Sequence, residues 1–491
     1  MRPTDADELC RLTATEIAAH IRTRTLSPTE VTEAALTRIA ERDGELGAFC
    51  TPTPDHARAA ARKIEDALAA GEDVGPLAGV PLGVKDLICT QGIRTTSGSR
   101  AYADFVPDED DIVVERAVAA GAVVLGKTNA SEFGYGPTGD NPLFPVTRNP
   151  WDPARTSGGS SAGSGAAVAA GMAPVALGSD GGGSIRIPAS LCGLVGFKAS
   201  MGRVPVYPGC RDERYPGVNG WESVEHIGPL TRTVADAALM LSVLAGPDPR
   251  DRHSIPCDDV AWTVRRPVGR LRIAYSPDLG RIAVDPEVRR VVENAVRVFE
   301  RDLGADVDLV DLELPDYAEA FGAIVAAETD LTGMRAMAER LGDGMSPHLR
   351  ALLATPWTAE QFTDASRVRK AVANRLARLL TTYDLIVSPT TAVAAFPVGM
   401  RGPREIDGRT VDEDHWTTFT PIANMASLPA ASLPAGLTAQ GLPVGIHLIG
   451  RHLGDATLLD ACAAFEAAAP WPLLPPGDRS GDRADRVRQG R

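Results

Sequence analysis

The chain contains 491 residues, of which 44% are hydrophobic and 23% are charged. Both fractions are close to globular averages, so the composition excludes a disordered or fibrous protein. The formal net charge of -14 provides no positive field for phosphates or anionic lipids, which argues against nucleic acid as the main ligand.

The cysteines, the first residues and the most apolar stretch indicate the cellular compartment of the protein. Seven cysteines are an odd number without a C-x-x-C pair, which predicts reduced thiols in the cytoplasm. Acidic residues near the start of the chain disfavour a signal peptide. The most apolar stretch, Ala162 to Leu177, is interrupted by Pro174 and is shorter than the roughly 20 residues of a bilayer-spanning helix. We therefore expect neither secretion nor membrane insertion.

Residues 1–70 are predicted to form helices that pack on the core. Thr13 and Glu16 have the spacing of a capping box. Ser27 is expected to cap a second helix, because a proline follows it directly and Glu30 lies three positions after Ser27. Apolar residues then recur at helical spacing.

Residues 71–250 are predicted to form the core of an α/β fold. The apolar runs 79–85 and 120–126 are typical of buried strands, and the spacing within 110–119 predicts a helix between them. Gly, Pro and Asn predict a loop over 134–153.

The segment from residue 156 to residue 184 is the least usual part of the sequence. Residues 156–165 predict a loop that leads into a helix over 166–172, and 174–178 predict a short strand. Three glycines then stand directly before Ser184. Such a run can expose several backbone N–H groups toward one point, although it is also common in ordinary turns.

Residues 251–474 are predicted to continue the same α/β domain, because no linker divides the chain. Asp285 is expected to cap a helix whose apolar face includes Val288 and Phe299. The other expected elements are strands at 307–314, 385–389 and 430–434 and a closing helix over 456–468. Residues 475–491 are predicted to be a mobile tail.

Two glycine-rich motifs suggest other chemistries but lack required features. The run from Gly158 to Gly163 is followed by Ser164, where a phosphate-binding P-loop needs lysine. A G-x-S-x-G pattern would make Ser161 the nucleophile of an α/β-hydrolase, yet the two prolines in 149–155 cannot belong to the central strand that precedes such a nucleophile. We therefore favour neither a nucleotide site nor Ser161 as nucleophile.

A lysine base offers a third chemistry. Only five of the 50 basic residues are lysines, and Lys85 ends an apolar run in which burial favours the neutral amine. A neutral amine can take the proton of a serine nucleophile. Taken alone, Lys85 is better explained as a lysine that reaches solvent or pairs with Asp86. Its occurrence together with Ser160 and Ser184 favours acyl transfer.

Several blocks of the sequence resemble the signature blocks of the amidase signature family. The densest stretch lies between Gly79 and Pro205 and contains GVPLGVKD, GKTNASEF, SGGSSAGS and GSDGGGSIRIPA. HIGPLTR, PAASLP and GLPVGI follow later in the chain. The resemblance covers nearly the whole length and implies one large α/β/α domain with a mixed, mainly parallel sheet covered by helices.

The resemblance also implies the residues of the reaction. Ser184 is expected to be the nucleophile, Lys85 the base and Ser160 the hydroxyl between them, with a cis bond before Ser160. Asp180 and Arg186 are expected to pair beneath the glycine loop and hold its shape. The oxyanion hole is expected to consist of the N–H groups of Gly181, Gly182, Gly183 and Ser184.

One position departs from the family pattern, and several others are assigned no chemistry. Many relatives carry Thr at the position of Gly181, which is the one departure from the family pattern. Lys127 and Lys198 lie in matching blocks and are expected to be structural. The histidines show no metal-binding spacing, so neither a metal nor a cofactor is expected.

The implied activity is that of an amidase, which hydrolyses a linear carboxamide to an acid plus ammonia or an amine, with esterase activity as a side reaction. The same triad would serve the A-type subunit of a glutamine-dependent amidotransferase, which releases ammonia for a partner enzyme. A catalytically silent binding protein on this fold is a third alternative. The segments 271–398 and 210–221 should distinguish the first two functions.

The expected partners are a small-molecule amide and a second copy of the chain, because relatives commonly form homodimers. Residues 135–144, 206–221 and 321–357 are expected to supply the pocket walls. The sequence does not identify the acyl group or the amine.

Overall fold

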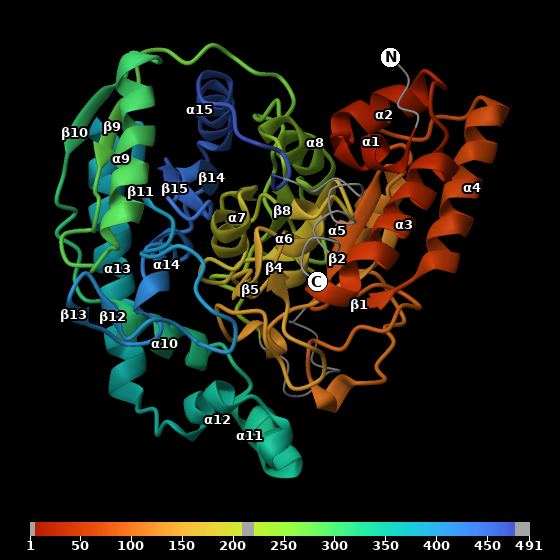
Figure 1. The fold of residues 1–491 in the computed structure, drawn as a ribbon. Helices are drawn as coiled ribbons and strands as arrows, with labels where there is room; N and C mark the ends of the chain where they lie inside the picture. The colour runs from red at the N-terminus through yellow and green to blue at the C-terminus, as the bar shows by residue number, and fades with distance from the viewer. Residues whose placement is uncertain (1–4, 209–219, 477–491) are drawn as a thin grey trace, which may run out of the picture.

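The computed structural model of the protein describes residues 5–208 and 220–476. Most of the expected tail and most of the insertion at 210–221 therefore lie outside the described residues. Figure 1 shows the arrangement, with helices packed around one large central sheet.

The large sheet has eleven strands in the order β1-β3-β2-β6-β8-β7-β14-β15-β11-β9-β10. Their bounds are β1 (Phe49–Pro52), β2 (Pro81–Lys85), β3 (Val123–Thr128), β6 (Val175–Ser179), β7 (Val195–Lys198), β8 (Ile227–Thr231), β9 (Arg272–Tyr275), β10 (Asp306–Leu309), β11 (Leu385–Pro389), β14 (Ala430–Leu437) and β15 (Pro443–Gly450). Two small hairpins pair β4 (Arg148–Asn149) with β5 (Asp152–Thr156) and β12 (Glu405–Ile406) with β13 (Arg409–Thr410).

The sheet is mixed, and its parallel pairings lie on its two flanks. On one flank β2 runs parallel to both β3 and β6, and on the other β9 runs parallel to both β10 and β11. The strands between β6 and β11 pair antiparallel. The expected fold class, one α/β domain with a large mixed sheet, is confirmed. The sheet is less parallel than the resemblance implies, since four of its strand pairings in the described residues are parallel and six are antiparallel. Strands from 71–250 and from 251–474 share this one sheet.

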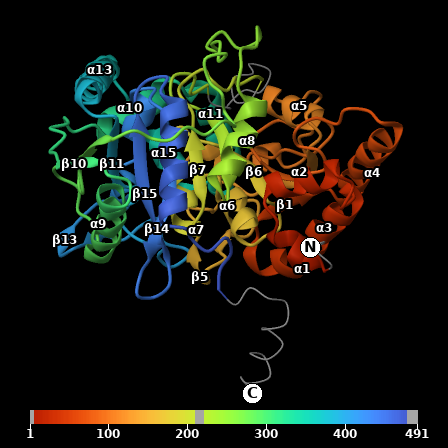
Figure 2. The ribbon, with the colours of Figure 1, turned by 90° about the horizontal axis from the view of Figure 1, so that it is seen from above.

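The helices cover both faces of the sheet. Their bounds are α1 (Ala6–Arg11), α2 (Ala14–Arg22), α3 (Pro28–Leu46), α4 (Pro54–Ala70), α5 (Ile112–Ala119), α6 (Ala162–Ala169), α7 (Arg186–Cys192), α8 (Val234–Leu244), α9 (Pro286–Arg301), α10 (Ala318–Ala327), α11 (Leu331–Leu341), α12 (Pro347–Ala354), α13 (Ala359–Thr382), α14 (Pro421–Met425) and α15 (Asp455–Ala468). Figures 1 and 2 place α1–α4 at one end of the molecule and α9, α10 and α13 at the other.

Two glycines of β15 show how the layers are arranged. Gly445 faces Ser190 of α7, whereas Gly450, an odd number of positions further on, faces Leu458 of α15. Successive residues of a strand point to opposite faces, so α7 and α15 lie on opposite sides of the sheet.

Several elements differ from the sequence-based expectations. Helix α6 begins at Ala162, inside the stretch expected to be loop, because its glycines and alanines allow close packing. The expected strand over 307–314 is only the four residues of β10. The N-terminal segment is not wholly helical, since β1 pairs with β3 at the edge of the sheet. Both expected capping boxes form, at Thr13 and at Ser27.

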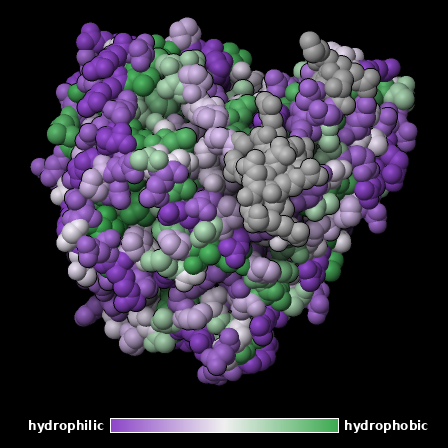
Figure 3. Space-filling view, in the orientation of Figure 1, coloured by the Kyte–Doolittle hydropathy of each residue, from purple (hydrophilic) through white to green (hydrophobic). Residues whose placement is uncertain are grey.

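One face of the molecule illustrates the distribution of polar and apolar residues on the surface. On the face shown in Figure 3, hydrophilic residues predominate and hydrophobic ones form small, scattered patches. Within the described ranges, every helix is too short or too polar to cross a membrane.

Candidate active site

Lys85 is the last residue of β2, and its side chain is fully buried. The strand's neighbours on both sides are parallel, which places its carboxyl end beside the loops that follow β3 and β6. Lys85 Nζ donates to Ser160 Oγ at 2.7 Å and to Ser179 Oγ at 2.9 Å. The structure therefore brings the expected base and the expected intermediate hydroxyl into direct contact.

Ser160 lies on the loop between β5 and α6, and its exposed fraction is 1%. The Gly159–Ser160 peptide bond is cis, as the family resemblance implies. A Cβ on Gly159 would lie 2.5 Å from the Thr138 carbonyl oxygen, so only glycine fits there. The Ser160 carbonyl accepts from the Ser131 N–H at 3.2 Å, which further fixes this loop.

Ser184 lies on the turn between β6 and α7 and is partly exposed, unlike Lys85 and Ser160. The Ser161 N–H donates to the Ser184 carbonyl at 3.2 Å, and the Ser161 hydroxyl donates to the Ser179 carbonyl at 3.2 Å. Ser161 thus ties the loop of Ser160 to the loop of Ser184. These two contacts give Ser161 a role in shaping the site.

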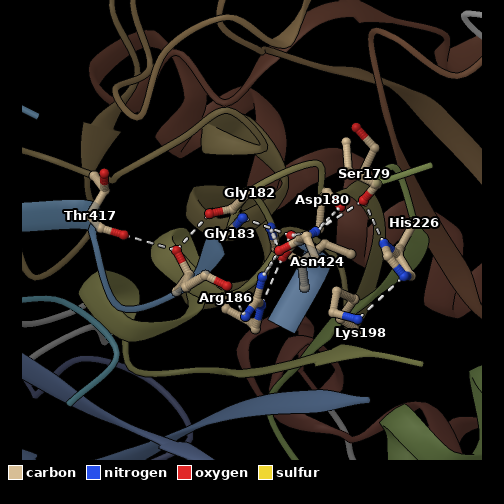
Figure 4. A network of polar contacts seen from close by, with 12 residues as sticks. Ser179, Asp180, Gly182, Gly183, Arg186, Lys198, His226, Thr417 and Asn424 are labelled. Carbon is tan, nitrogen blue, oxygen red and sulfur yellow. Dashed lines mark hydrogen bonds and ion pairs between the residues drawn. The ribbon is translucent and has the colours of Figure 1, made fainter. Parts of the chain in front are cut away.

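A buried ion pair supports the Ser184 turn, as Figure 4 shows. Arg186 Nη2 and Nε donate to the two oxygens of Asp180 at 2.9 and 3.0 Å, and neither side chain is exposed. Burial alone would raise the pKa of Asp180, but Arg186 and the Asn424 amide outweigh it and hold the pKa well below its usual range. The carboxylate is therefore ionised and able to accept several bonds.

Asp180 uses those bonds to shape the glycine turn. Its oxygens accept from the N–H of Gly183 at 2.7 Å and from the N–H of Ile185 at 3.1 Å. The Gly183 N–H, which the resemblance assigns to the oxyanion hole, is thus engaged by Asp180. Within the described residues, the N–H groups of Gly181, Gly182 and Ser184 make no hydrogen bond.

A second pair of buried groups lies behind Asp180. Lys198 Nζ is 3.3 Å from His226 Nε2, and the backbone of His226 pairs with that of Asp180. Burial lowers the pKa of Lys198 to about 7, and burial together with Lys198 lowers the pKa of His226 well below its usual value. Their contacts link β7 and β8 to the turn, consistent with a structural role for Lys198.

Aromatic rings form one wall of the turn. A Cβ on Gly181 would lie 3.0 Å from Cε3 of Trp221, and one on Gly182 would lie 2.6 Å from Cζ of Phe321. The side chain of Trp221 also packs edge to face on Tyr135, with ring centroids 4.6 Å apart. A threonine at position 181 would crowd Trp221, which explains in physical terms why this chain has glycine there.

Each of the three segments expected to line the pocket contributes one of these rings: Tyr135, Trp221 and Phe321. Residues 209–219, within the second of those segments, lie outside the described part of the chain.

Three residues of the site were not identified from the sequence. The Ser179 hydroxyl contacts Lys85, and its only sequence signal was its place in a signature block. Thr420 and Asn424 contact Gly182 and Asp180 from more than 230 positions away. No local pattern in the sequence could have linked them to the turn. In the described ranges, His, Cys, Asp and Glu side chains form no cluster of three suited to a metal.

Comparison with known proteins decides the family. The family model described as Amidase matches residues 30–459. The chain belongs to the amidase signature family. A curated relative is the A-type subunit of the glutamyl-tRNA(Gln) amidotransferase of Chloroflexus aurantiacus, which is 38% identical over 94% of this chain and 98% of its own length.

Solved amidase signature structures share the fold. A bacterial aryl acylamidase of the family matches with a TM-score of 0.86 and 33% identity, covering 94% of this chain and 96% of its own. The 6-aminohexanoate cyclic dimer hydrolase, solved with substrate, matches with a TM-score of 0.83 and 30% identity, covering 96% and 99%. The recognition of the amidase signature from the sequence blocks is thereby confirmed.

Proposed function

We propose that this member of the amidase signature family cleaves a carboxamide through a seryl acyl-enzyme. The observation that carries the proposal is the 2.7 Å hydrogen bond between the buried amine of Lys85 and Ser160 Oγ, next to the turn that presents Ser184. A buried amine in contact with two serine hydroxyls is suited to accept a proton from serine.

The reaction proceeds in two halves. Ser184 Oγ bonds to the amide carbon while its proton passes through Ser160 to Lys85. The C–N bond then breaks, and the proton returns through Ser160 to the leaving nitrogen. In the second half, water attacks the carbonyl carbon of the ester while its proton passes through Ser160 to Lys85. The C–O bond to Ser184 then breaks, the proton returns to Ser184 Oγ, and the acid is released. The N–H groups of Gly181, Gly182 and Ser184 would stabilise the oxyanion, at about 3 kcal/mol for each well-placed donor.

Glutamine is the first candidate substrate. The relative from Chloroflexus aurantiacus is named as part of a glutamyl-tRNA(Gln) amidotransferase, and the match spans 98% of its length. This supports the alternative function of the sequence analysis, an A-type subunit that releases ammonia for a partner enzyme, more strongly than it supports a stand-alone amidase. We also propose that the protein works in the cytoplasm, on the basis of its cysteine pattern.

A stand-alone amidase is the second candidate, and the aromatic wall favours it. Rings of Trp221 and Phe321 lie against the turn that carries the reacting serine. Flat apolar groups pack well on aromatic rings, whereas the zwitterionic end of glutamine needs charged partners. One of the solved structures that share the fold is named as an aryl acylamidase, and another is named as a 6-aminohexanoate cyclic dimer hydrolase.

The deciding experiment measures ammonia or amine release by the purified protein alone. The panel contains glutamine, benzamide, acetanilide and aliphatic amides, and Ser184→Ala is the control. Release from glutamine only, or only after partner proteins are added, would support the amidotransferase function. Efficient release from aryl amides without partners would support the stand-alone amidase. Turnover that persists in Ser184→Ala would refute the acyl-enzyme proposal.

A further inference from the structure

Thr420, at the start of α14, contacts the glycine turn from the C-terminal half of the chain. Its side chain is fully buried, and Oγ1 donates to the Gly182 carbonyl at 2.6 Å across 238 positions of sequence. Oγ1 also lies 3.1 Å from the Thr417 carbonyl. A hydroxyl has only one proton to donate, so the shorter contact to Gly182 is the main bond. Figure 4 labels Gly182 and Thr417, whose carbonyls are the two acceptors, beside the ion pair.

The hydrogen bond from Thr420 is the second of two bonds that fix the orientation of the Gly182–Gly183 peptide. The carbonyl of the Gly182–Gly183 peptide accepts from Thr420, and its N–H donates to Asp180 Oδ1 at 2.7 Å. Because a peptide unit is planar, two bonds at opposite ends fix its orientation. The flanking peptides carry the N–H groups of Gly182 and Ser184, so their directions depend on this plane.

Thr420 is itself held by the group that holds Asp180. The Thr420 carbonyl accepts from Arg186 Nη1 at 2.9 Å, and the Asn424 amide one turn later donates to Asp180 Oδ1 at 2.9 Å. The fit against the turn is close, since a Cβ on Gly183 would lie 2.7 Å from Cβ of Thr420 and would overlap Oγ1. Thr420 therefore has little freedom to move away from Gly182.

We propose that Thr420 is a positioning residue for the oxyanion hole. Its hydroxyl holds the Gly182–Gly183 peptide so that the N–H groups of Gly182 and Ser184 face the developing oxyanion. Thr420 touches neither substrate nor the reacting atoms, and its effect passes through the Gly182 carbonyl. The inference rests on the acyl-enzyme function proposed above but does not depend on which amide is the substrate.

The test compares Thr420→Val, which keeps the shape but removes the hydroxyl, with Thr420→Ser, which keeps the hydroxyl. A matched control is Thr418→Val, because the Thr418 hydroxyl donates to the carbonyl of His415 in the preceding turn, at 2.7 Å, rather than to the glycine turn. The first readout is the rate at which a fluorophosphonate labels Ser184, followed by mass spectrometry. In that step Ser184 Oγ bonds to phosphorus, fluoride leaves, and the serine proton passes to Ser160 and Lys85. The second readout is kcat and KM on p-nitrophenyl acetate.

We expect Thr420→Val to slow labelling and to lower kcat by about 10- to 100-fold, with KM nearly unchanged. This rate loss should not exceed the loss caused by removing one N–H donor of an oxyanion hole. Thr420→Ser should recover most of the rate, and Thr418→Val should match the wild type. Wild-type rates in a folded Thr420→Val protein would overturn the inference while leaving the acyl-enzyme intact. Equal losses in Thr420→Val and Thr420→Ser would also overturn it, because a purely structural role does not depend on the hydroxyl.

Failure of the proposed function gives a different result. Wild-type protein that is not labelled at Ser184, or is labelled equally in Ser184→Ala, would refute the nucleophile itself and the positioning role with it. Thermal unfolding of each variant, measured in parallel, identifies any variant that fails to fold.

Discussion

Three of the five lysines are fully buried, and their contacts separate their roles. Lys85 donates to the hydroxyls of Ser160 and Ser179 and, at 3.3 Å, to the Ser179 carbonyl. Lys127 instead donates to the Ile88 carbonyl and the Thr90 hydroxyl, and Lys198 donates to the Leu428 carbonyl. Of these three lysines, Lys85 is the one whose amine contacts two serine hydroxyls, and a hydroxyl can pass its proton to an amine whereas a carbonyl has none to give.

Lys85→Arg tests this distinction. Arginine also supplies N–H donors on a long side chain but is not deprotonated in proteins, so it cannot act as the base. We expect a loss in kcat/KM of at least about 100-fold, typical for a general base. The measurement is amide or ester turnover by protein shown to be folded by circular dichroism.

Lys127→Met serves as the matched control for that experiment. Lys127 is equally buried and lies on the neighbouring strand, so its replacement should lower the stability but not the activity of each folded molecule. If Lys85→Arg retained wild-type turnover, or if Lys127→Met lost it equally, Lys85 would not be the base.

The buried ion pair between Asp180 and Arg186 is expected to stabilise the folded protein. Removing the charge of Asp180 in Asp180→Asn leaves Arg186 buried without its partner, which should destabilise the protein by about 3–5 kcal/mol. Because the folded-state pKa of Asp180 lies below its unfolded value, the pair contributes stability above about pH 4, and that contribution is lost as the pH falls further. Urea unfolding at pH 7 and at lower pH measures both effects.

The control for Asp180 is a carboxylate in an exposed ion pair. Asp364 and Arg367 pair at 3.3 Å on α13 with side chains 70% and 72% exposed, so Asp364→Asn should change stability very little. Comparable losses in the two variants would contradict the special role of the buried pair.

At the scale of elements, α6 depends on how closely its backbone approaches the sheet. A Cβ on Gly163 would collide with the Ala48 carbonyl and with the backbone of Asn129 after β3. The helix carries the Ser160 loop at its N-terminal end, so this close packing places that loop next to Lys85. The alanines and glycines of the stretch are therefore packing residues, and the helix begins earlier than sequence spacing suggests.

Gly163→Ala tests that account. The added methyl group must push α6 away from β1 and β3, which should cost at least about 1–3 kcal/mol of stability. Gly44→Ala on α3 is the matched control, since a Cβ there meets nothing within 4 Å and alanine should stabilise the helix by about 0.5–1 kcal/mol. Denaturant unfolding of both variants is the measurement. A Gly163→Ala protein as stable as the wild type would contradict the close approach.

For the molecule as a whole, helices far apart in sequence meet across the fold. Glu466 of α15 accepts from the N–H of Val234, the first residue of α8, at 3.1 Å. Burial raises the pKa of Glu466 to about 7. The negative charge of Asp236 also raises this pKa, and the hydrogen bond from Val234 lowers it. The folded protein therefore binds this proton more tightly than the unfolded chain, whose glutamate titrates near 4.5.

The sign of the resulting pH dependence follows from this difference. The contribution of the protonated Glu466 to stability is complete below about pH 4.5 and is lost as the pH rises toward 7. Glu466→Gln keeps an acceptor for Val234 but does not titrate. We expect the free energy of unfolding of the wild type to fall relative to the variant by about 1–2 kcal/mol between pH 5 and pH 8. Parallel pH profiles for the two proteins would show that Glu466 is not protonated in the fold.

The amino-acid sequence alone determined most of the fold class and the residues proposed for the chemistry. The signature blocks identified Lys85, Ser160 and Ser184, and their glycines anticipated the tight turns, because such turns depend on local backbone freedom. The helix caps at Thr13 and Ser27 could also be predicted from the sequence, because a capping box is a local pattern of only four residues.

Only the tertiary structure decided which groups support that chemistry. The sheet order brings the end of β2 beside the end of β6, and it places α14 against the glycine turn, so that Thr420 and Asn424 contact residues near 180. It also shows that the Gly183 N–H is engaged by Asp180, which a run of glycines cannot reveal. Contacts between distant segments depend on the packing of the whole sheet and its helices, and no local spacing in the sequence carries that information.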